Sequence, residues 1–327
     1  MKFEKSGYHG IILSDYGIGL DSSSPNIELN LISHAHADHV PRDRRVSVIT
    51  TESTRRFMEL RGFRGEIKTL GFLEPLETEQ ARITLYPAGH ILGSAMIYVE
   101  TDEGNLLYTG DFRTPPSPAS EGFQLPQNVD YFITEATFGL PIYKWDSHEV
   151  IFEQIRNFAS RTLDAGETPI FFGYNLGKAQ EIMHALSPLN HPIQIHGAGY
   201  PLCQVYSDHG IDLGPYDKYN KDTVADAILV APSSVQESAM IRNIRNKRIA
   251  YCSGWASHES RRQQMIVDEL IPLSDHVDFF ELLALIKTLQ PRHTWVTHSP
   301  NPKVILHYLR ELGYSASSLD MALKEED

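Results

Sequence analysis

Three histidines and one aspartate crowd into residues 34–39, HAHADH, directly after an apolar stretch that predicts a β-strand. Side chains two residues apart in an extended chain point the same way, so His34 and His36 can bind one cation through their imidazole nitrogens. Asp38 and His39 then turn towards a second position. Such a cluster is costly to pack unless a cation neutralises the carboxylate and fixes the histidine tautomers. The segment predicts a metal site at a strand end, and a polar surface loop is the alternative.

Isolated ligands at other predicted strand ends extend this site. His90 follows Gly89, Asp111 follows Gly110, and His298 ends a late strand; each glycine allows the backbone to come close to a metal centre. A satisfied loop histidine or a turn aspartate is the alternative reading of each. The donors are nitrogen and oxygen without thiolate, which suits zinc and tolerates manganese. We therefore expect two divalent metal ions, with zinc favoured.

The chain changes character near its middle. Short β-branched or aromatic stretches predict strands over 10–13, 29–33, 46–50, 83–87, 95–100, 106–109 and 131–134. Later segments predict helices over 147–163, 177–186, 279–289 and 303–312, alternating with strands over 169–172, 193–196, 227–230, 249–253 and 293–297. The alternation predicts a mostly parallel sheet in an α/β protein.

Composition places the chain among ordinary globular proteins. It has 327 residues, of which 41% are hydrophobic and 22% charged. No apolar run is long enough for a membrane span, and the first residues lack the apolar core of a signal peptide, so we expect a cytoplasmic protein without a membrane partner. Cys203 and Cys252 are too few for a disulfide framework and are expected to be buried thiols.

A formal net charge of −13 argues against a protein that coats nucleic acid non-specifically, because phosphate binding relies on lysine and arginine. A local basic track remains an alternative to solvated charged faces. The candidate clusters are Arg42, Arg44 and Arg45; Arg55, Arg56, Arg61 and Arg64; Arg242, Arg245, Lys247 and Arg248; and Arg261 with Arg262.

The motifs resemble, in order and over nearly the whole chain, those of metallo-β-lactamase-fold nucleases of the β-CASP group. The resemblance is strongest to the compact bacterial ligase-associated DNA exonucleases and extends to mRNA 3′-end processing factors. The matching motifs are SHAHADH (33–39), PAGHILGSA (87–95), YTGDF (108–112), TEATFGLP (134–141), GKAQ (177–180), SGW (253–255), LSDH (273–276) and VTH (296–298). The resemblance implies an αββα sandwich over 1–141 and 271–327, with a β-CASP cap domain inserted over 142–270.

Roles for the site residues follow from this resemblance. It implies that one metal is bound by His34, His36 and His90, the other by Asp38, His39 and His298, with Asp111 bridging them. It also implies that His276 touches the scissile phosphate or protonates the leaving oxygen, and that Glu135 orients His276. With Asp38, these form the expected catalytic set. Without the resemblance, His276 would be a surface histidine and Glu135 a cap or turn carboxylate.

Two positions depart from the family pattern. The family has a supporting aspartate after an early strand; both Asp15 and Asp21 could fill this place, and Asp21 is favoured because it lies nearer the histidine segment. Relatives usually place glycine after the last histidine, whereas this chain has Ser299 and Pro300. We therefore expect the loop beyond His298 to have a different shape and its substrate contact to differ from that of the relatives.

The resemblance implies a two-metal phosphodiesterase that acts on nucleic acid, foremost a DNA exonuclease in repair or end processing beside a DNA ligase or helicase. An RNA-processing nuclease is the nearest alternative, because only contacts to the 2′-hydroxyl separate the two substrates. A small-molecule metallo-hydrolase is disfavoured by Glu135 and His276, and a non-catalytic scaffold by the complete ligand set.

Some residues stay open or without a role. Lys178, after Gly177, opens a predicted helix and either contacts a phosphate or merely starts the helix. Trp255 either stacks a base or lies in the core. No role is assigned to His148, His184, His196, His209 or His258.

Overall fold

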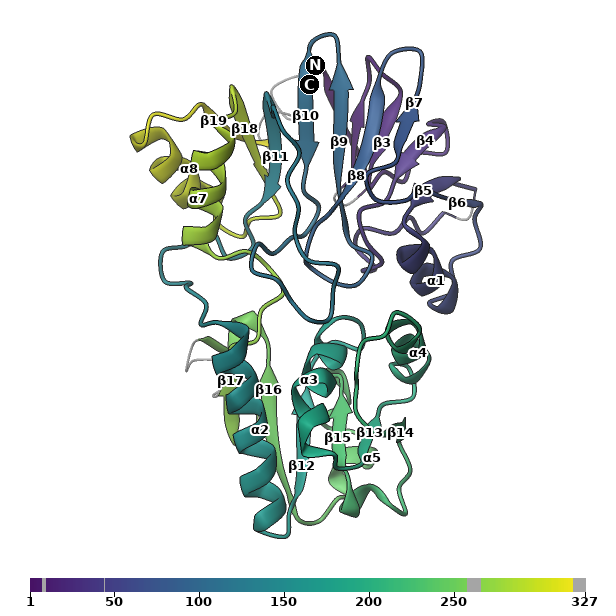
Figure 1. The fold of residues 1–327 in the computed structure, drawn as a ribbon, viewed down its shortest axis with the longest axis vertical. Coiled ribbons are helices and arrows are strands. Elements are labelled where there is room, and N and C mark those ends of the chain that lie inside the picture. The colour runs from purple at the N-terminus through teal and green to yellow at the C-terminus, as the bar shows by residue number, and fades with distance from the viewer. Residues whose placement is uncertain (8–9, 44, 258–265, 320–327) are drawn as a thin grey trace. The chain divides into compact units, whose positions relative to one another are not determined.

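The computed structural model describes the chain except for residues 8–9, 44, 258–265 and 320–327 (Figure 1). The chain forms two compact units. Unit 1 is built from three segments, Met1–Pro116, Ser120–Lys144 and His276–Asp327, and unit 2 from Ser117–Ala119 and Trp145–Asp275. The domain boundaries expected from the sequence, after residues 141 and 270, remain predictions.

Two mixed sheets form the frame of unit 1 in the described residues. The first has the order β1-β2-β3-β4-β5-β6 and the second the order β19-β18-β11-β10-β9-β8-β7. The strands of the first sheet are β1 (Phe3–Ser6), β2 (Gly10–Leu13), β3 (Ile18–Leu20), β4 (Leu29–Leu31), β5 (Val48–Thr50) and β6 (Ile67–Thr69). Those of the second are β7 (Pro75–Glu77), β8 (Arg82–Pro87), β9 (Ala95–Thr101), β10 (Gly104–Tyr108), β11 (Tyr131–Glu135), β18 (His293–Thr297) and β19 (Ala316–Ser318).

A shared cluster of buried apolar side chains joins the two sheets. Ile11 and Leu20 of the first sheet and Ile83, Ile97 and Ile133 of the second belong to one buried apolar cluster. Burying apolar faces against one another is the main favourable contribution to such a fold. The opposite face of the second sheet has its own cluster, so this sheet is covered on both sides.

Unit 1 has three α-helices among its described residues: α1 (Glu52–Leu60), α7 (Phe279–Leu289) and α8 (Pro302–Glu311). Leu282 and Ile286 of α7 and Ile305 of α8 bury their apolar faces in the second cluster, and both helices lie beside β18 and β19 (Figure 1). The side chain of Asp278 caps α7 by accepting from the backbone N–H groups of Phe280 and Glu281. This cap fixes where the helix begins, three residues after His276.

Unit 2 is a wholly parallel sheet with helices. Its order is β14-β13-β15-β12-β16-β17. The strands are β12 (Thr168–Phe172), β13 (Ile193–Ile195), β14 (Tyr216–Lys218), β15 (Ile228–Ala231), β16 (Lys247–Cys252) and β17 (Glu269–Ile271). The α-helices in the described part of unit 2 are α2 (His148–Asp164), α3 (Lys178–Leu186), α4 (Tyr200–Asp208) and α5 (Ala239–Arg242). Short 3₁₀ turns lie at Ser187–Leu189, Val224–Asp226, Ser233–Val235 and Gly254–Ser257.

Helical periodicity in α2 explains how it packs. Its buried residues Ile151, Ile155 and Phe158 recur three or four positions apart, and the ring of Phe158 meets that of Phe171 in β12 at 5.3 Å. β12 is buried along its whole length, as expected for a parallel strand covered on both faces. The mixed α/β character expected from the sequence is confirmed.

None of the helices in the described part of the chain combines the length and apolar composition needed to cross a bilayer. Cys203 and Cys252 are both buried free thiols, as expected. Burial raises the pKa of Cys203 to about 11. Arg44, His258, Arg261 and Arg262 lie outside the described residues.

Candidate metal centre

The histidine segment follows β4 as an irregular turn. His34 and His39 are buried, His36 is half-buried and Asp38 is exposed. The Ser33 carbonyl, after β4 of the first sheet, accepts a hydrogen bond from the Ala95 N–H of β9 in the second sheet at 2.8 Å, which holds the start of the segment against β9. The segment therefore begins on a rigid strand end and turns outward at Asp38.

Strand direction explains why distant ligands meet. β10, β11 and β18 are parallel, and β8 runs the same way because two antiparallel pairings separate it from β10. The residues that follow these strands therefore share one edge of the second sheet. They are His90 after β8, Asp111 after β10 and His298 after β18.

Four side chains meet at this edge. His34, His36, His90 and Asp111 each bring one potential ligand atom within 4.8 Å of the others. The His36 Nδ1 and His90 Nε2 atoms are 3.1 Å apart. Asp38, His39 and His298 lie outside this four-residue group, although the rings of His39 and His298 have their centres 5.1 Å apart.

One carboxylate oxygen faces histidines of both expected ligand sets. Asp111 Oδ2 lies 3.5 Å from His34 Nε2, 3.5 Å from His39 Nε2 and 3.9 Å from His90 Nε2. These separations exceed a hydrogen bond. They leave a small polar space bounded by a carboxylate and imidazole nitrogens.

Two glycines permit this close arrangement. Gly110, before Asp111, has φ +55°, and a Cβ there would lie 2.5 Å from Cβ of Ser33. Gly89, before His90, has φ +74°, and a Cβ there would lie 2.3 Å from the carbonyl oxygen of Arg113. Both positions favour glycine for conformation and for space.

Asp21 organises the second layer of the site. Its Oδ1 accepts from the Ser33 backbone N–H at 2.7 Å, and its Oδ2 lies 2.7 Å from Ser33 Oγ, 2.7 Å from His39 Nδ1 and 2.8 Å from the Tyr108 hydroxyl. A carboxylate that accepts from His39 Nδ1 directs Nε2 of the same ring towards Asp111. The alternative, Asp15, is exposed and accepts instead from the backbone N–H of Lys2.

Electrostatics favour an anionic Asp111 beside a neutral His34. Burial and the neighbouring His39 lower the pKa of His34 well below 6.5. Burial disfavours the charged form of Asp111, but His39 and His276 hold its pKa well below 3.8. Burial also opposes the charge of His39, yet Asp111 and Asp21 hold its pKa well above 6.5. Carboxylate and neutral imidazole are the forms that bind metals.

A test of the fit to a metal comes from His34. Its Nδ1 lies 3.0 Å from Ser33 Oγ, while its buried Nε2 has no hydrogen-bond partner among the described residues. A buried ring nitrogen without a partner is costly. A divalent cation between this nitrogen and the Asp111 carboxylate would satisfy it, so the residues present fit a metal.

A second constellation adjoins this group. His276 Nδ1 lies 2.9 Å from Oε1 and 3.0 Å from Oε2 of Glu135. The Glu135 carboxylate is fully buried and also accepts from the Phe112 N–H at 3.0 Å and the Thr137 hydroxyl at 2.6 Å. Since a carboxylate only accepts, the His276 Nδ1 carries the proton and Nε2 remains for exchange. The ring of His276 lies 4.8 Å from that of His90.

His298 ends β18 in an unusual backbone conformation. Its φ is +48°, which favours glycine or asparagine, and its carbonyl accepts from the Thr137 hydroxyl at 3.3 Å. Non-glycine residues held in this region tend to occur at functional sites. The ligand role of His298 stays a prediction.

Several arginine side chains in the candidate basic clusters have protein partners. Arg45 pairs with Asp43, Arg55 with Glu52 and Glu59, and Arg248 with Glu167. Arg61 donates to the carbonyl of Ala35 inside the histidine segment at 2.9 Å. These pairings favour solvated or structural faces over a continuous phosphate track.

Lys178 likewise has a partner within unit 2. Its ammonium forms a buried ion pair with Asp275. The expected helix start is confirmed, because α3 begins at Lys178. The phosphate contact stays a prediction. Trp255 is half-buried in a 3₁₀ turn after β16.

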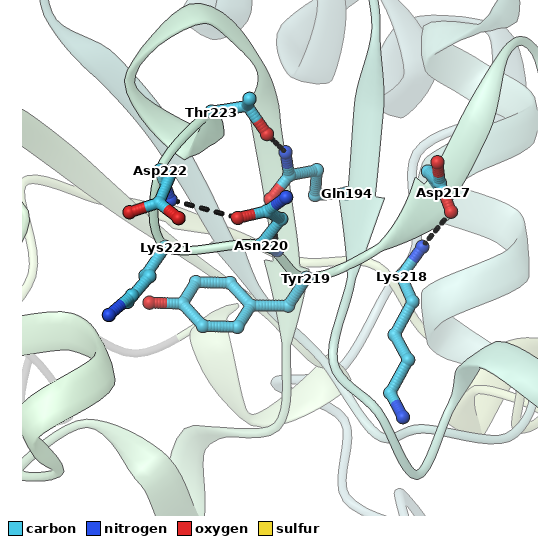
Figure 2. Close-up of a pocket in the computed structure, with 8 residues that line it drawn as sticks. All are labelled: Gln194, Asp217, Lys218, Tyr219, Asn220, Lys221, Asp222 and Thr223. Carbon is cyan, nitrogen blue, oxygen red and sulfur yellow. Dashed lines mark hydrogen bonds between the residues drawn. The ribbon is translucent and has the colours of Figure 1, made fainter.

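Unit 2 also contains a surface hollow beside the edge strand β14. Its volume is about 500 Å³, and its lining includes Gln194, Lys218, Tyr219 and Lys221 (Figure 2). Gln194 donates to the Thr223 hydroxyl and accepts from the Asn220 N–H, which ties the loop to the sheet. None of the expected site residues lines it.

Sequence reasoning did not single out several residues that support the site. Ser33 and Tyr108 are the first residues of two of the sequence motifs, but nothing in their spacing predicts a shared contact with Asp21. Thr137 and the Phe112 backbone support Glu135 in the same way. A buried tyrosine at the end of a strand was the one available signal, because its hydroxyl needs a partner.

Comparisons with known proteins agree with the motifs. No family model matches the chain. A protein of Opitutus terrae described as a probable DNA ligase is 33% identical over 296 residues, 89% of this chain and 28% of that protein. An RNase J-like protein of Methanocaldococcus jannaschii is 28% identical over 53% of this chain and 48% of its own length.

A third relative is cleavage and polyadenylation specificity factor subunit 3 of Dictyostelium discoideum, 27% identical over 54% of this chain and 27% of that protein. The chain thus spans between 27% and 48% of the length of these three relatives. A crystal structure of an Enterococcus faecalis protein of unknown function superposes with a TM-score of 0.61 at 13% identity, over 84% of this chain and 76% of that one. That likeness concerns the fold alone. These relatives confirm the family resemblance found in the motifs: the chain is homologous to the metallo-β-lactamase-fold nucleases of the β-CASP group.

Proposed function

We propose that this protein is a two-metal nuclease that hydrolyses phosphodiester bonds, with an αββα metallo-β-lactamase domain and a β-CASP cap over 142–270. One observation carries the proposal. A single oxygen of Asp111 lies 3.5 Å from a nitrogen of His34 and 3.5 Å from one of His39, which are expected to serve different metals. A bridging carboxylate needs this kind of position.

The proposed ligands form two sets, one for each metal ion. Under the proposal, His34, His36 and His90 hold one ion, Asp38, His39 and His298 hold the other, and Asp111 serves both. Two divalent ions, with zinc favoured and manganese tolerated, supply a nucleophile at neutral pH and offset negative charge at the phosphate. Asp21 orients His39 through Nδ1, and Tyr108 and Ser33 hold Asp21.

His276 is the proposed proton donor. Glu135 accepts the Nδ1 proton of His276 and fixes the orientation of the ring. Nε2 then gives its proton to the oxygen that leaves phosphorus, so that the departing group does not carry full negative charge. Asp38 completes the proposed catalytic set by holding its ion beside the reacting phosphate.

DNA ends are the proposed substrate, in repair or end processing. Support comes from the Opitutus terrae relative, which is described as a probable DNA ligase and is matched over 89% of this chain. Functional association with a DNA ligase or helicase is part of the same proposal, as is a cytoplasmic location.

RNA is the second candidate substrate. The printed descriptions of the Methanocaldococcus jannaschii and Dictyostelium discoideum relatives, an RNase J-like protein and a cleavage and polyadenylation factor, favour it. A small-molecule metallo-hydrolase is disfavoured by the proposed cap insertion and by the presence of Glu135 and His276, which the resemblance associates with the nucleases.

The test uses purified protein and single-stranded oligonucleotides of one sequence made as DNA and as RNA. Each carries a 5′-phosphate or a 5′-hydroxyl, with a label at one end or at the other, and is incubated with zinc or manganese. We expect a ladder of DNA products that shortens from one terminus, with slower cleavage of RNA. Faster cleavage of RNA would favour the second candidate. Intact nucleic acid with either metal, in protein that elemental analysis shows to contain none, would overturn the proposal.

A further inference from the structure

The first turn of α3 is unusually rich in buried charge. Lys178 is 3% exposed and Glu181 2% exposed, although charged side chains are seldom fully buried unless they are paired. Both lie in unit 2 and neither belongs to the proposed metal centre. Buried charges of this kind need a reason, because apolar residues of the same size are often equally stabilising.

Each charge has a partner from a different part of unit 2. The Lys178 ammonium pairs with Asp275, whose side chain is 3% exposed. Glu181 Oε1 accepts from the Ser117 hydroxyl at 2.6 Å and lies 3.4 Å from His148 Nε2. Ser117, His148 and Asp275 all lie at or near places where the chain enters or leaves unit 2.

The partners mark the places where the chain passes between the two units. Ser117 lies in the short segment Ser117–Ala119 that unit 2 takes from the middle of unit 1. His148 opens α2, shortly after unit 2 begins at Trp145, and Asp275 is the last residue of unit 2. One helical turn thus fastens all the crossing segments to the body of unit 2.

Asp275 is covalently joined to His276. The ring of His276 is held by Glu135 through Nδ1, but its backbone leaves directly from the residue that Lys178 anchors. Displacement of a catalytic group by about 1 Å can reduce a rate by about 10²-fold. The ion pair therefore fixes the backbone position from which the chain enters His276.

We infer that Lys178, through its buried ion pair with Asp275, is a positioning residue for His276 in leaving-group protonation, and that Glu181 holds the same turn to the other crossing segments. The inference rests on the proposed function. In the step concerned, water gives one proton to solvent and its oxygen bonds to phosphorus, the bond from phosphorus to the leaving oxygen breaks, and that oxygen takes the proton from His276 Nε2, which solvent then replaces.

The test compares two substrates that differ in their need for a proton. A DNA oligonucleotide releases an alkoxide that must be protonated, whereas thymidine 5′-(p-nitrophenyl phosphate) releases a phenolate that departs without a proton. We expect Lys178→Met to lower kcat for the oligonucleotide by about 10²-fold, to leave kcat for the nitrophenyl ester unchanged, and to leave metal content unchanged. Lys178→Arg, which keeps the charge, should restore most of the oligonucleotide activity.

One control variant and one double variant accompany Lys178→Met. Lys221→Met removes an exposed lysine from the loop beside the hollow and should match the wild type on both substrates (Figure 2). The double variant Lys178→Gln with Asp275→Asn removes both charges and so avoids an unpaired buried carboxylate if Lys178→Met does not fold. It should show the same selective loss.

Comparison with His276→Ala distinguishes failure of the Lys178 inference from failure of the proposed proton-donor role. His276→Ala should lose oligonucleotide cleavage selectively. If it does while the folded Lys178 variants cleave both substrates normally, or lose both equally, Lys178 has only a structural role or none, and the inference is wrong. If His276→Ala itself loses both substrates equally, the proton-donor assignment is wrong and the inference is overturned with it.

Discussion

Asp21 shows at the scale of one residue how a buried charge becomes part of a site. Its carboxylate is 3% exposed and faces Ser33, His39 and Tyr108. Such outer partners fix the ring orientation of a ligand histidine. Asp21 itself has φ +49°, so the backbone bends at this residue to aim the side chain inward.

Removing one donor tests this arrangement. Tyr108→Phe keeps the ring and deletes the hydroxyl that donates to Asp21 at 2.8 Å. We expect metal affinity to fall by about tenfold and the free energy of unfolding by about 1–3 kcal/mol. Tyr98→Phe is the matched control: its hydroxyl donates to the carbonyl of Gln127, so stability but not metal affinity should change. Zinc titration and urea unfolding measure both; equal metal affinity in Tyr108→Phe and wild type contradicts the expectation.

A second residue-scale prediction separates binding from chemistry. Asp38→Ala should lose both nucleic acid cleavage and bound metal, because it removes a proposed ligand. His276→Ala should lose cleavage but keep its metal, because Glu135 rather than an ion holds its ring. Elemental analysis measures the bound metal of each variant, and the oligonucleotide assay measures its cleavage. Equal metal loss in both variants refutes this division of roles.

Single residues also show where sequence reasoning stops. The spacing of His34 and His36 predicted ligands on one side of a strand end, and the structure brings them together with His90 and Asp111. His148 was assigned no role, yet it lies 3.4 Å from Glu181. Nothing in the sequence spacing indicates that contact, because tertiary packing alone brings the first residue of α2 to the first turn of α3.

At the scale of elements, long periodic segments were predicted well. The helix α7 (Phe279–Leu289) has the bounds expected from its apolar spacing, and β12, β16 and β18 lie where apolar runs predicted strands. The helix α1 was missed, although Thr51 is a suitable N-cap whose hydroxyl accepts from the Thr54 N–H. Short strands such as β6, with two exposed residues, were missed because pairing defines them rather than an apolar pattern.

The first turn of α3 gives an element-scale prediction about pH. Burial disfavours the charge of Glu181, but the His148 contact outweighs this and lowers the pKa of Glu181 below 4.5 in the folded state. Its stabilisation is therefore present above pH 4.5 and is lost as the pH falls through the folded-state pKa.

Hydrogen exchange in α3 between pH 7 and about pH 3 measures this. Protection should fall less with acid in Glu181→Gln than in the wild type, after correction for intrinsic exchange rates. Glu237→Gln, at an exposed position in the same unit, is the control and should behave as the wild type. Parallel pH profiles for Glu181→Gln and the wild type contradict the expected role of this carboxylate.

At the scale of the whole molecule, all proposed metal ligands belong to unit 1, while unit 2 has an apolar cluster of its own around Ile170 and Leu229. Metal binding should therefore stabilise the two units unequally. A ligand present at about 100 times its Kd stabilises the folded state by about 2.7 kcal/mol.

Chelation tests this coupling. Treatment with EDTA should lower protection from hydrogen exchange around β4, β10 and β18, and leave β12 and β15 unchanged. Restoring zinc should reverse the effect. A uniform loss across both units would show that they unfold as one and would contradict separate stabilisation.

The ligand positions run from His34 near one end of the chain to His298 near the other, with all of unit 2 encoded between Asp111 and His298. A ribosome releases these positions in order, and early domains can fold while later ones are still being made. A nascent chain that has already folded unit 2 still lacks His298. The proposed ligand set would thus be completed only after every residue of unit 2 has been synthesised.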